Sequence, residues 1–464
     1  MKTTLLQLSV IFLVAFMQTQ SSLQAQVRWM PDESVRTGAG GSMDVKMAFN
    51  NAHSVAASGV SRFITWVRTD SLFVAESVSG GAWSAPRLIT RGSAQMNLPT
   101  IAATSDGRLC IGWHEPNGVK TTFSTDGGKT WGAAQILASR GAALSLAAGQ
   151  NGVLYALWHS GNDDTPSDMM FATWQNGAWS AAKAIDAASA TNAALWGSLC
   201  VSGTTLFAVW RENTTGEFRV YLTRSVNGGV TWEVPRNVVK EDRSGDPTVA
   251  FASGQVIVAY QRAQQIYTIT SGDAAGTTFN APNLIGPGLF ARVIANDNGL
   301  VAVAWERFTG TNGRNDAVKQ TGFVYSTDYG FTFSKDSALS AMGSKLGLVQ
   351  FTGANEITAS WFNVNNGGTV VAKRASVGNM VAVHEIAVLE ASIAPNPASG
   401  VITLRLPSPT QARVRVMNML GSEVLQASVN GTAPTLDVSL LARGAYMVEV
   451  WQGSAVARQI LILQ

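Results

Sequence analysis

The chain has 464 residues, enough for two or three domains, and 46% of them are hydrophobic, so a sizeable core is expected. Charged residues make up only 14%, acidic and basic ones are interleaved, and the formal net charge is +3, which argues against a nucleic-acid or anionic-membrane partner. The 45 glycines, the short alternating apolar runs and the absence of long helical periodicity predict an all-β protein.

Residues 1–25 have the features of a secretory signal peptide. Lys2 gives a basic start, an apolar run extends from Leu5 to Met17, and Ala25 offers a small residue at a cleavage point. The run is too short for a stable membrane span. We therefore expect an exported mature chain without a transmembrane segment.

Apolar runs that end in an aromatic residue recur along residues 26–380. They end at Trp66, Trp113, Trp158, Trp210, Tyr260, Trp305 and Trp361. A period of about 40 to 50 residues built from strands is typical of a β-propeller with one four-stranded blade per period. We expect seven blades, with six as the alternative if one of the runs is an insertion.

The last repeat lacks its outer strand, and a matching segment stands at the start of the mature chain. Trp29-Met30-Pro31 followed by Ser34-Val35-Arg36 is similar to the outer-strand segment from Trp83 to Leu88. We predict that the N-terminal strand completes the last blade and closes the ring, which removes the open edge of a linear array.

A turn motif, Ser-x-Asp/Asn-x-Gly-x-Thr-Trp/Phe, occurs three times, and we call it the lock turn. Its Asp or Asn can accept hydrogen bonds from backbone N–H groups ahead of it, and its Gly supplies a positive φ. One such turn should join the third and fourth strands of a blade. The oxygen atoms do not alternate as in a calcium loop, so neither a metal nor a cofactor is predicted. The residues with this structural role are Ser124, Asp126, Gly128, Trp131, Ser225, Asn227, Gly229, Trp232, Ser326, Asp328, Gly330 and Phe333, and weaker copies start at Ser79, Gln175 and Ser271.

Polar residues collect on the opposite face of the predicted ring, where the loops between second and third strands meet the links between blades. Arginine can bind a carboxylate through two hydrogen bonds, so an acidic sugar is a candidate ligand. The alternative is a rim of solvated strand ends joined by Arg–Glu pairs. The candidate ligand-binding residues are Arg68, His114, Glu115, His159, Arg211, Glu212, Arg262, Glu306, Arg307, Asp246 and Arg292.

The sequence changes character at about residue 393. A turn cluster is followed by alternating strands that predict a small immunoglobulin-like sandwich of about seven strands. The expected organisation is a signal peptide (1–25), a propeller (26–380), a linker (381–392) and a C-terminal domain (393–464). Cys110 and Cys200 fall in non-adjacent blades, so we expect two buried free thiols rather than a disulfide.

The C-terminal segment resembles a known family. Pro395-Asn396-Pro397, then Gly421, then Leu441 with Gly444-x-Tyr446 and an apolar end closely resemble the C-terminal (type A) sorting domain of the bacterial type IX secretion system. The resemblance implies passage through the outer membrane, a secreted or cell-surface location, and the secretion machinery as partner.

The lock turns resemble the Asp-box, or BNR repeat, of the sialidase superfamily, in which they are fold elements far from the chemistry. Sialidases use three arginines, a Tyr nucleophile activated by a Glu, and an Asp acid/base. The early Arg-Ile-Pro signature of that family is absent here, and none of the seven tyrosines clearly lies at the mouth of the ring, so catalytic residues are not assigned.

Three functions follow as alternatives. The first is a sialidase-like propeller that binds a glycan or a protein at the face of the loops between second and third strands. The second is an exo-glycosidase of sialidase-like fold acting on an acidic sugar such as sialic acid, with Glu115, Glu212, Glu306 or Asp246 as candidate carboxylates. The third is an adhesion or surface-layer protein anchored by its tail.

Overall fold

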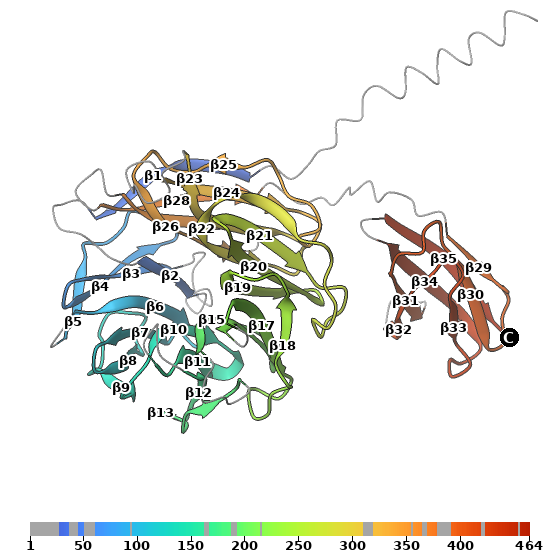
Figure 1. The fold of residues 1–464 in the computed structure, drawn as a ribbon, viewed down its shortest axis with the longest axis horizontal. Helices are drawn as coiled ribbons and strands as arrows, with labels where there is room; N and C mark the ends of the chain where they lie inside the picture. Colours follow the sequence, from blue (N-terminus) through green and yellow to red (C-terminus); the bar gives the residue numbers. More distant parts are fainter. Residues whose placement is uncertain are drawn as a thin grey trace, which may run out of the picture. The chain divides into compact units, whose positions relative to one another are not determined.

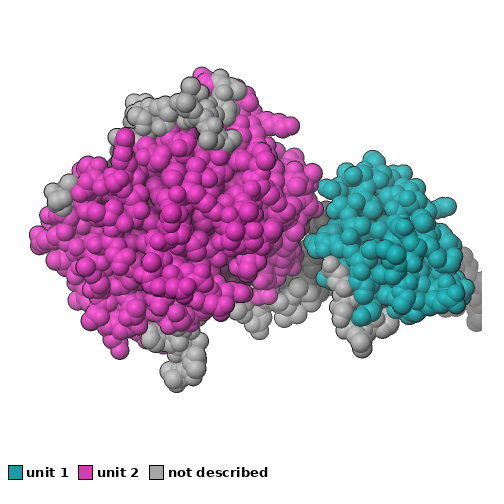
Figure 2. Space-filling model, turned by 90° about the horizontal axis from the view of Figure 1, so that it is seen from below, with its two compact units in different colours: residues 1–26, 378–464 teal, residues 27–377 magenta. Residues whose placement is uncertain are grey.

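The computed structural model describes residues 27–36, 45–50, 61–92, 95–161, 167–186, 193–213, 216–309, 319–353, 356–363, 369–377, 391–418, 423–452 and 455–464. The chain divides into a unit of residues 27–377 and a unit of residues 1–26 and 378–464 (Figure 2). The predicted signal peptide, most of the predicted linker and Gly421 lie outside the described residues. Among the described residues, no helix is long and apolar enough to cross a membrane.

The strands of residues 27–377 pair antiparallel in successive groups, most of them of four strands, which we number as blades 1 to 7 along the chain. Blade 1 contains β2 (Val45–Asn50), β3 (Ser61–Arg68), β4 (Ser71–Val78) and β5 (Arg87–Arg91). Blade 2 contains β6 (Asn97–Ala103), β7 (Leu109–Glu115), β8 (Gly118–Ser124) and β9 (Gln135–Ala138). Blade 3 contains β10 (Ala142–Ala148), β11 (Leu154–His159), β12 (Met169–Gln175), and the short edge strands β13 (Ala178–Trp179) and β14 (Lys183–Ala184).

Blades 4 to 6 continue this order, but blades 5 and 6 share a strand. Blade 4 contains β15 (Ala193–Ser202), β16 (Thr205–Asn213), β17 (Phe218–Ser225) and β18 (Arg236–Val239). Blade 5 contains β19 (Ser244–Ala252), β20 (Gln255–Arg262), β21 (Gln265–Thr270) and the first part of β22 (Asn283–Ala295). The second part of β22 begins blade 6 and is followed by β23 (Val301–Phe308), β24 (Lys319–Ser326) and β25 (Ser337–Ala338).

Blade 7 is built from both ends of the unit. It contains β26 (Ser344–Gly353), β27 (Glu356–Asn363), β28 (Thr369–Val377) and, at its outer edge, β1 (Val27–Arg36). β1 runs antiparallel to β28, from the pair Val27 and Val377 to the pair Arg36 and Val370. The prediction that the N-terminal strand completes the last blade is confirmed.

The first strands of the blades surround the centre of the unit, and the last strands lie toward its rim (Figure 1). Each of β2, β6, β10, β15, β19, β22 and β26 contacts the next, and β26 contacts β2, so these strands form a closed ring. This is the architecture of a β-propeller, as the sequence predicts. The aromatic residues that define the repeat are all 2% exposed or less, and those of blades 1 to 6 belong to core clusters that join neighbouring blades.

Glu33 of β1 joins blade 7 to blade 1 across the closure. It accepts hydrogen bonds from Arg374 Nε in β28 at 2.5 Å, from Arg62 Nη2 in β3 at 3.2 Å and from Trp83 Nε1 at 2.8 Å. The Arg62 side chain is only 1% exposed, and this burial lowers its pKa while the Glu33 charge raises it. The closure therefore holds a buried charge pair in addition to the strand pairing.

The three lock turns form the same hydrogen-bond pattern. In each, the Ser hydroxyl donates to the Asp or Asn side chain at 2.6–3.0 Å and accepts from the backbone N–H of the Gly at 2.8–2.9 Å. The same Asp or Asn oxygen accepts from the Thr N–H at 2.9 Å. In the first copy, the hydrogen bond from Thr130 Oγ1 is the main reason that the pKa of Asp126 lies well below its usual range.

The lock turns also pack against the preceding blade. A Cβ atom added to Gly229 would lie 2.4 Å from the ring of Phe171 in blade 3, and one added to Gly128 would lie 2.9 Å from the ring of Phe63 in blade 1. Both glycines have φ near +84°, a region that other residues rarely adopt. Each glycine therefore serves both the turn and the contact between blades.

A fourth turn of this kind is centred on Asp273, in one of the weaker copies of the motif. Its carboxylate accepts hydrogen bonds from the N–H groups of Ala275, Thr277 and Thr278. Burial alone would raise the pKa of Asp273, but hydrogen bonds from Thr277 and Thr278 lower it to about 2. This turn stabilises blade 5 through hydrogen bonds of the same kind as those that the lock turns form in blades 2, 4 and 6.

The C-terminal unit is a β-sandwich. One sheet contains β29 (Ser392–Ala394), β30 (Val401–Arg405) and β33 (Thr435–Asp437). The other contains β32 (Glu423–Val429), β31 (Ala412–Asn418), β34 (Gly444–Gln452) and β35 (Ala455–Leu463). Alternate residues of both sheets, such as Ile402, Val416 and Val448, form its core.

Both cysteines are free thiols, as the blade assignment predicts. Cys110 is fully buried in β7, whereas Cys200 in β15 is only partly buried, which corrects the expectation of two buried thiols. Desolvation raises the pKa of both, that of Cys200 to about 12, so neither is a reactive thiolate at neutral pH.

Candidate functional site

The mouth face is the face of the propeller at which the second strands end, and it contains the candidate residues. There, the last residues of each second strand pair with the first residues of the first strand in the same blade. The pairs are His114 with Asn97, His159 with Ala142, Arg211 with Leu195, Gln261 with Gly245, and Glu306 with Leu289.

Three of the candidate carboxylates are buried and already bound to neighbouring side chains. Glu115, Glu212 and Glu306 are each 2% exposed. Trp113 Nε1 and Lys120 Nζ donate to Glu115 at 2.9 and 3.0 Å, Trp210 Nε1 donates to Glu212 at 2.7 Å, and Lys319 Nζ donates to Glu306 at 3.1 Å. These residues are therefore part of the packing, which departs from the expectation of an accessible ring of carboxylates.

Two candidate arginines are bonded within their own blade, and the two candidate histidines are at least partly buried. Arg307 donates to Asp336 at 2.7 Å and to Gln320 at 3.0 Å. Arg292 donates to its neighbour's carbonyl, Ala291 O, at 3.0 Å. His159 is fully buried and His114 is half-buried, so neither imidazole stands free on the surface.

Arg68 and Arg262 are exposed at the ends of β3 and β20. They belong to blades 1 and 5, which are not neighbours in the ring. In the ring, these two arginines are separated by blades 2 to 4 on one side and by blades 6 and 7 on the other.

The structure does bring Arg211, Asp246 and Gln261 together, from blades 4 and 5. Arg211 Nη1 lies 3.4 Å from Asp246 Oδ1, and Gln261 Nε2 donates to Asp246 Oδ2 at 2.5 Å. Gln261 Oε1 in turn accepts the N–H of Phe290, in blade 6, at 3.1 Å. This network fixes the relative positions of three neighbouring blades at the mouth face.

Arg211 is held in a defined orientation. Its guanidinium carbon lies 4.7 Å from the centre of the Phe218 ring, in cation–π contact. Its side chain keeps 23% of its surface exposed, and its buried Nε has no hydrogen-bond partner among the described residues. A guanidinium positioned in this way, with donor capacity left, can bind an oxyanion.

A row of β-bulges lies beside this network and was not predicted from the sequence. In blades 2 to 6, the pairing of the first and second strands shifts by one residue near the mouth face. A residue with positive φ occupies each bulge, and these residues are Leu98, Ala143, Trp196, Asp246 and Phe290. Bulges redirect side chains out of the regular alternation, here next to the ends of the second strands.

Asp186, in the link between β14 and β15, is a second residue that the sequence did not reveal. Desolvation raises its pKa to about 6, and the charges of Asp168 and Glu212 add to the shift. Its buried Oδ1 has no hydrogen-bond partner among the described residues. The only sequence signal was its place in a blade link, which many surface carboxylates share.

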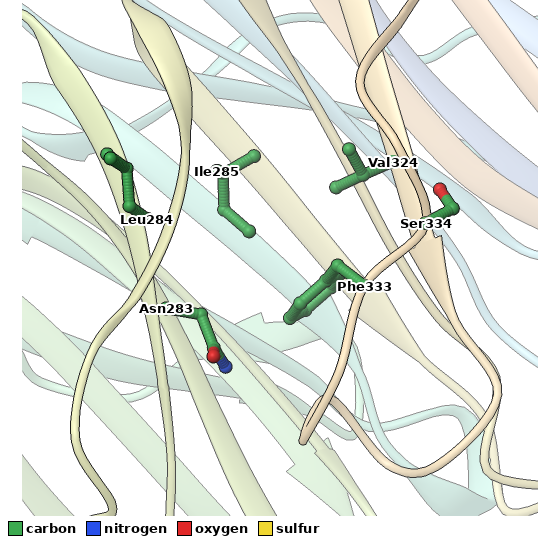
Figure 3. A pocket seen from close by; sticks show the side chains of 6 residues that line it. All are labelled: Asn283, Leu284, Ile285, Val324, Phe333 and Ser334. Atoms are coloured by element: carbon green, nitrogen blue, oxygen red, sulfur yellow. The ribbon is translucent and has the colours of Figure 1, made fainter.

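A small pocket of about 160 Å³ lies elsewhere, between the first part of β22 and β24 (Figure 3). Its lining includes Phe333 of the third lock turn, and none of the eleven candidate residues contributes to it. The pocket is therefore a gap between blades 5 and 6 and not part of the mouth face.

Comparison with known families accounts for the C-terminal unit. Residues 392–464 match the family described as a secretion system C-terminal sorting domain. The resemblance to a type IX sorting domain is confirmed. The protein is thus directed by type IX secretion to the cell surface or beyond it, and the sorting domain is the part that interacts with the secretion machinery.

Comparison with solved structures supports the fold of the remaining chain. A polysaccharide lyase of family PL25, an ulvan lyase, is 11% identical with a TM-score of 0.51, covering 76% of this chain and 96% of its own. A protein of unknown function from Dyadobacter fermentans is 13% identical (TM-score 0.47; 76% and 99% covered), and a Trypanosoma rangeli sialidase is 12% identical (TM-score 0.45; 82% and 86% covered). No curated protein matches the sequence.

Proposed function

We propose that this protein is a secreted or cell-surface β-propeller that binds an acidic glycan at its mouth face. In this proposal the signal peptide covers residues 1–25, the lock turns are Asp-box (BNR) elements of a sialidase-like propeller spanning residues 26–380, and the sorting domain follows a linker at 381–392. The propeller supplies the binding site, and the sorting domain supplies the export.

The proposal rests on the fixed orientation and partial exposure of the Arg211 side chain. The cation–π contact with Phe218 and the ion pair with Asp246 restrict its rotamers before a ligand arrives, so less entropy is lost on binding. The part of its guanidinium that remains exposed can accept a sugar carboxylate through charge-assisted hydrogen bonds.

Binding is favoured over hydrolysis because the residues that hydrolysis needs are engaged. A glycosidase with two catalytic carboxylates requires both to reach the sugar, but Glu115, Glu212 and Glu306 are buried against Trp and Lys side chains. Tyr260 is 2% exposed, and desolvation raises its pKa, so it is not an activated nucleophile.

An exo-glycosidase of sialidase-like fold is the second candidate, and Asp186 is the observation that favours it. A carboxyl group with a pKa of about 6 can act as a general acid near neutral pH. We expect no release of fluorophore from a fluorogenic sialoside or uronide. Turnover that disappears in the Asp186→Asn variant would establish the enzymatic alternative.

The proposal is tested by titrating the full mature chain with oligogalacturonate, an acidic probe, after an array screen of acidic and neutral glycans. We expect Arg211→Ala to weaken binding about 10- to 100-fold, because the variant lacks the charge-assisted hydrogen bonds from the guanidinium to the sugar carboxylate. Arg211→Lys should recover part of the affinity because the charge remains while the planar fork is lost.

The matched control is Arg224→Ala. Arg224 is also 23% exposed and also paired with a carboxylate, that of Glu233, but it lies at the opposite end of its blade, next to a lock turn. It should leave binding unchanged. The proposal fails if the wild-type chain binds no acidic glycan on the array, or if the Arg211 and Arg224 variants bind alike.

A further inference from the structure

The four-stranded sheet of the C-terminal unit, β32-β31-β34-β35 (Figure 1), covers the core of the sandwich with one of its faces. Val416 of β31, Val448 of β34 and Ala457 of β35 belong to that core, so the residues next to them along each strand point outward. The outward residues of these three strands form a surface that we call the basic face. Its members are Arg413, Arg415, Met447, Trp451, Arg458 and Ile460.

Contacts with one carboxylate and one indole join the arginines of the basic face. Arg415 Nη2 donates to Glu449 Oε2 at 2.6 Å, and Arg458 Nε donates to Glu449 Oε1 at 2.7 Å. The guanidinium carbons of Arg415 and Arg413 lie 5.2 and 5.7 Å from the centre of the Trp451 ring, in cation–π contact. The strand register agrees, since it pairs Arg413 with Trp451 and places Glu449 between Arg415 and Arg458.

The positive charges of this face reach the surface, whereas the negative one does not. Glu449 is only 4% exposed, but the side chains of Arg415 and Arg458 keep 34% and 52% of their surface exposed. Burial alone would raise the pKa of Glu449, but hydrogen bonds from Arg458 and Arg415 lower it. The ionised carboxylate therefore orients both guanidinium groups before a partner arrives, which reduces the entropy lost on binding.

The outer face of the other sheet has a different composition. Ile402, Leu404 and Leu436 belong to the core, so the outward positions of β30 and β33 are Val401, Thr403, Arg405, Thr435 and Asp437. One basic and one acidic residue balance there, and most of the other positions are polar. Tryptophan, methionine and arginine, which the basic face presents together, are the residue types enriched in protein–protein interfaces. The composition therefore distinguishes the basic face as the side suited to docking.

We propose that the basic face is the surface through which the sorting domain docks on an acidic protein surface of the type IX secretion machinery. Three arginines against one buried carboxylate give the face a charge complementary to such a partner. Trp451, Met447 and Ile460, which is 51% exposed, supply the apolar contacts. Residues 392–464 belong to a family defined by sorting, so a docking surface is required somewhere on this unit.

The test measures export of the full chain, signal peptide included, from a bacterium with a working type IX system. Pulse labelling and immunoprecipitation give the rate at which the chain reaches the cell surface or the medium. Arg413→Glu should slow export about 10-fold or more, because a negative charge then faces the carboxylates of the partner. This variant leaves both Glu449 ion pairs in place. Arg413→Lys keeps the charge and should be exported as wild type is.

Trp451→Ser removes the indole of the basic face and should also slow export about 10-fold. The matched controls lie on the outer face of the other sheet. Arg405→Glu makes the same charge change as Arg413→Glu, and Val401→Ser removes an apolar side chain that is 53% exposed. Both should be exported at the wild-type rate. Thermolysin resistance of the C-terminal unit, measured on each purified full chain, separates a docking defect from a folding defect, and Arg413→Glu decides the outcome if Trp451→Ser unfolds the unit.

The proposal is overturned if Arg413→Glu and Trp451→Ser are both folded and exported at the wild-type rate, or if the two controls are retained to the same extent. If only Trp451→Ser slows export, the partner surface is not acidic. If vesicles of phosphatidylglycerol bind wild type but not Arg413→Glu, and export is unchanged, the face binds anionic lipid instead. Glycan binding at the mouth face uses other residues, so failure of either proposal does not affect the other.

Discussion

Replacement of Glu33 by alanine tests how the ring is closed. In the wild-type chain, Glu33 receives hydrogen bonds from Arg374, Arg62 and Trp83, and it is the charge partner of a guanidinium that is 1% exposed. Removal of one partner of a buried ion pair leaves an uncompensated charge, which costs about 3–5 kcal/mol. One bond remains to Arg62, since Ser77 Oγ still accepts from its Nη2 at 2.6 Å, so we expect a loss of ~3 kcal/mol.

The free energy of unfolding is measured by urea denaturation of the full mature chain, followed by tryptophan fluorescence. Glu33→Gln provides a graded comparison, because an amide oxygen can still accept the Trp83 and Arg62 hydrogen bonds without carrying the charge. It should lose ~1–2 kcal/mol.

Asp32→Ala is the matched control, since Asp32 is the neighbouring carboxylate in the same strand. It pairs with Lys373 at 3.1 Å, but its side chain is 55% exposed, so its removal should cost less than about 1 kcal/mol. Equal losses for Asp32→Ala and Glu33→Ala would refute the argument that a buried charge pair, beyond the strand pairing itself, stabilises the closure.

Two further predictions concern the lock turns and Asp186. Gly229→Ala should destabilise the protein by ~3 kcal/mol in the same urea assay, because the new Cβ meets the Phe171 ring at 2.4 Å and φ is unfavourable. Gly228→Ala has a similar φ but only a 3.4 Å contact with the Tyr155 hydroxyl, and it should lose ~1 kcal/mol; equal losses would exclude the packing explanation. Asp186→Asn should raise the free energy of unfolding above pH 6, by ~1–2 kcal/mol, and have no effect below pH 4. The sign follows because folding raises this pKa from 3.8 to about 6, so the contribution of Asp186 to the wild-type stability is greatest at low pH and declines as the pH rises through 6.

The propeller was predictable because its signals are local. Each lock turn carries its Ser, Asp or Asn, and Gly at fixed spacing, and the hydrogen bonds of that turn use only those residues and the following Thr. The closure was predictable because the N-terminal segment around Trp29 is similar to an outer strand found in another blade. Neither inference required knowledge of which strands become neighbours.

The candidate carboxylates show where local reasoning was incomplete. Glu115 and Glu212 each follow a buried Trp by two residues, so alternation places them on the same side of the strand as the indole, beside its N–H. The sequence contained this information, although a position at a strand end suggested exposure. Glu306 differs, because its partner Lys319 comes from the paired strand β24.

The bulges could not be inferred from the sequence. A bulge arises when two strands pair out of step, so it depends on both strands and on the blade beside them rather than on one run of residues. Trp196 carried a faint signal, as a tryptophan outside both the repeat position and the lock turns. Its contact with His159, at the end of the second strand of the preceding blade, followed only from the structure.

β22 gives the ring an uneven stiffness. Most blade links contain residues outside the strands, whose φ and ψ angles can absorb a change in the angle between blades. β22 instead runs for 13 residues from the edge of blade 5 into the first position of blade 6, paired with β21 and then with β23. A hinge needs residues whose backbone dihedral angles can change, so we expect changes in the angle between blades to occur at the other links. Blades 5 and 6 are therefore coupled by continuous strand pairing, which ties their backbones together more directly than a loop would.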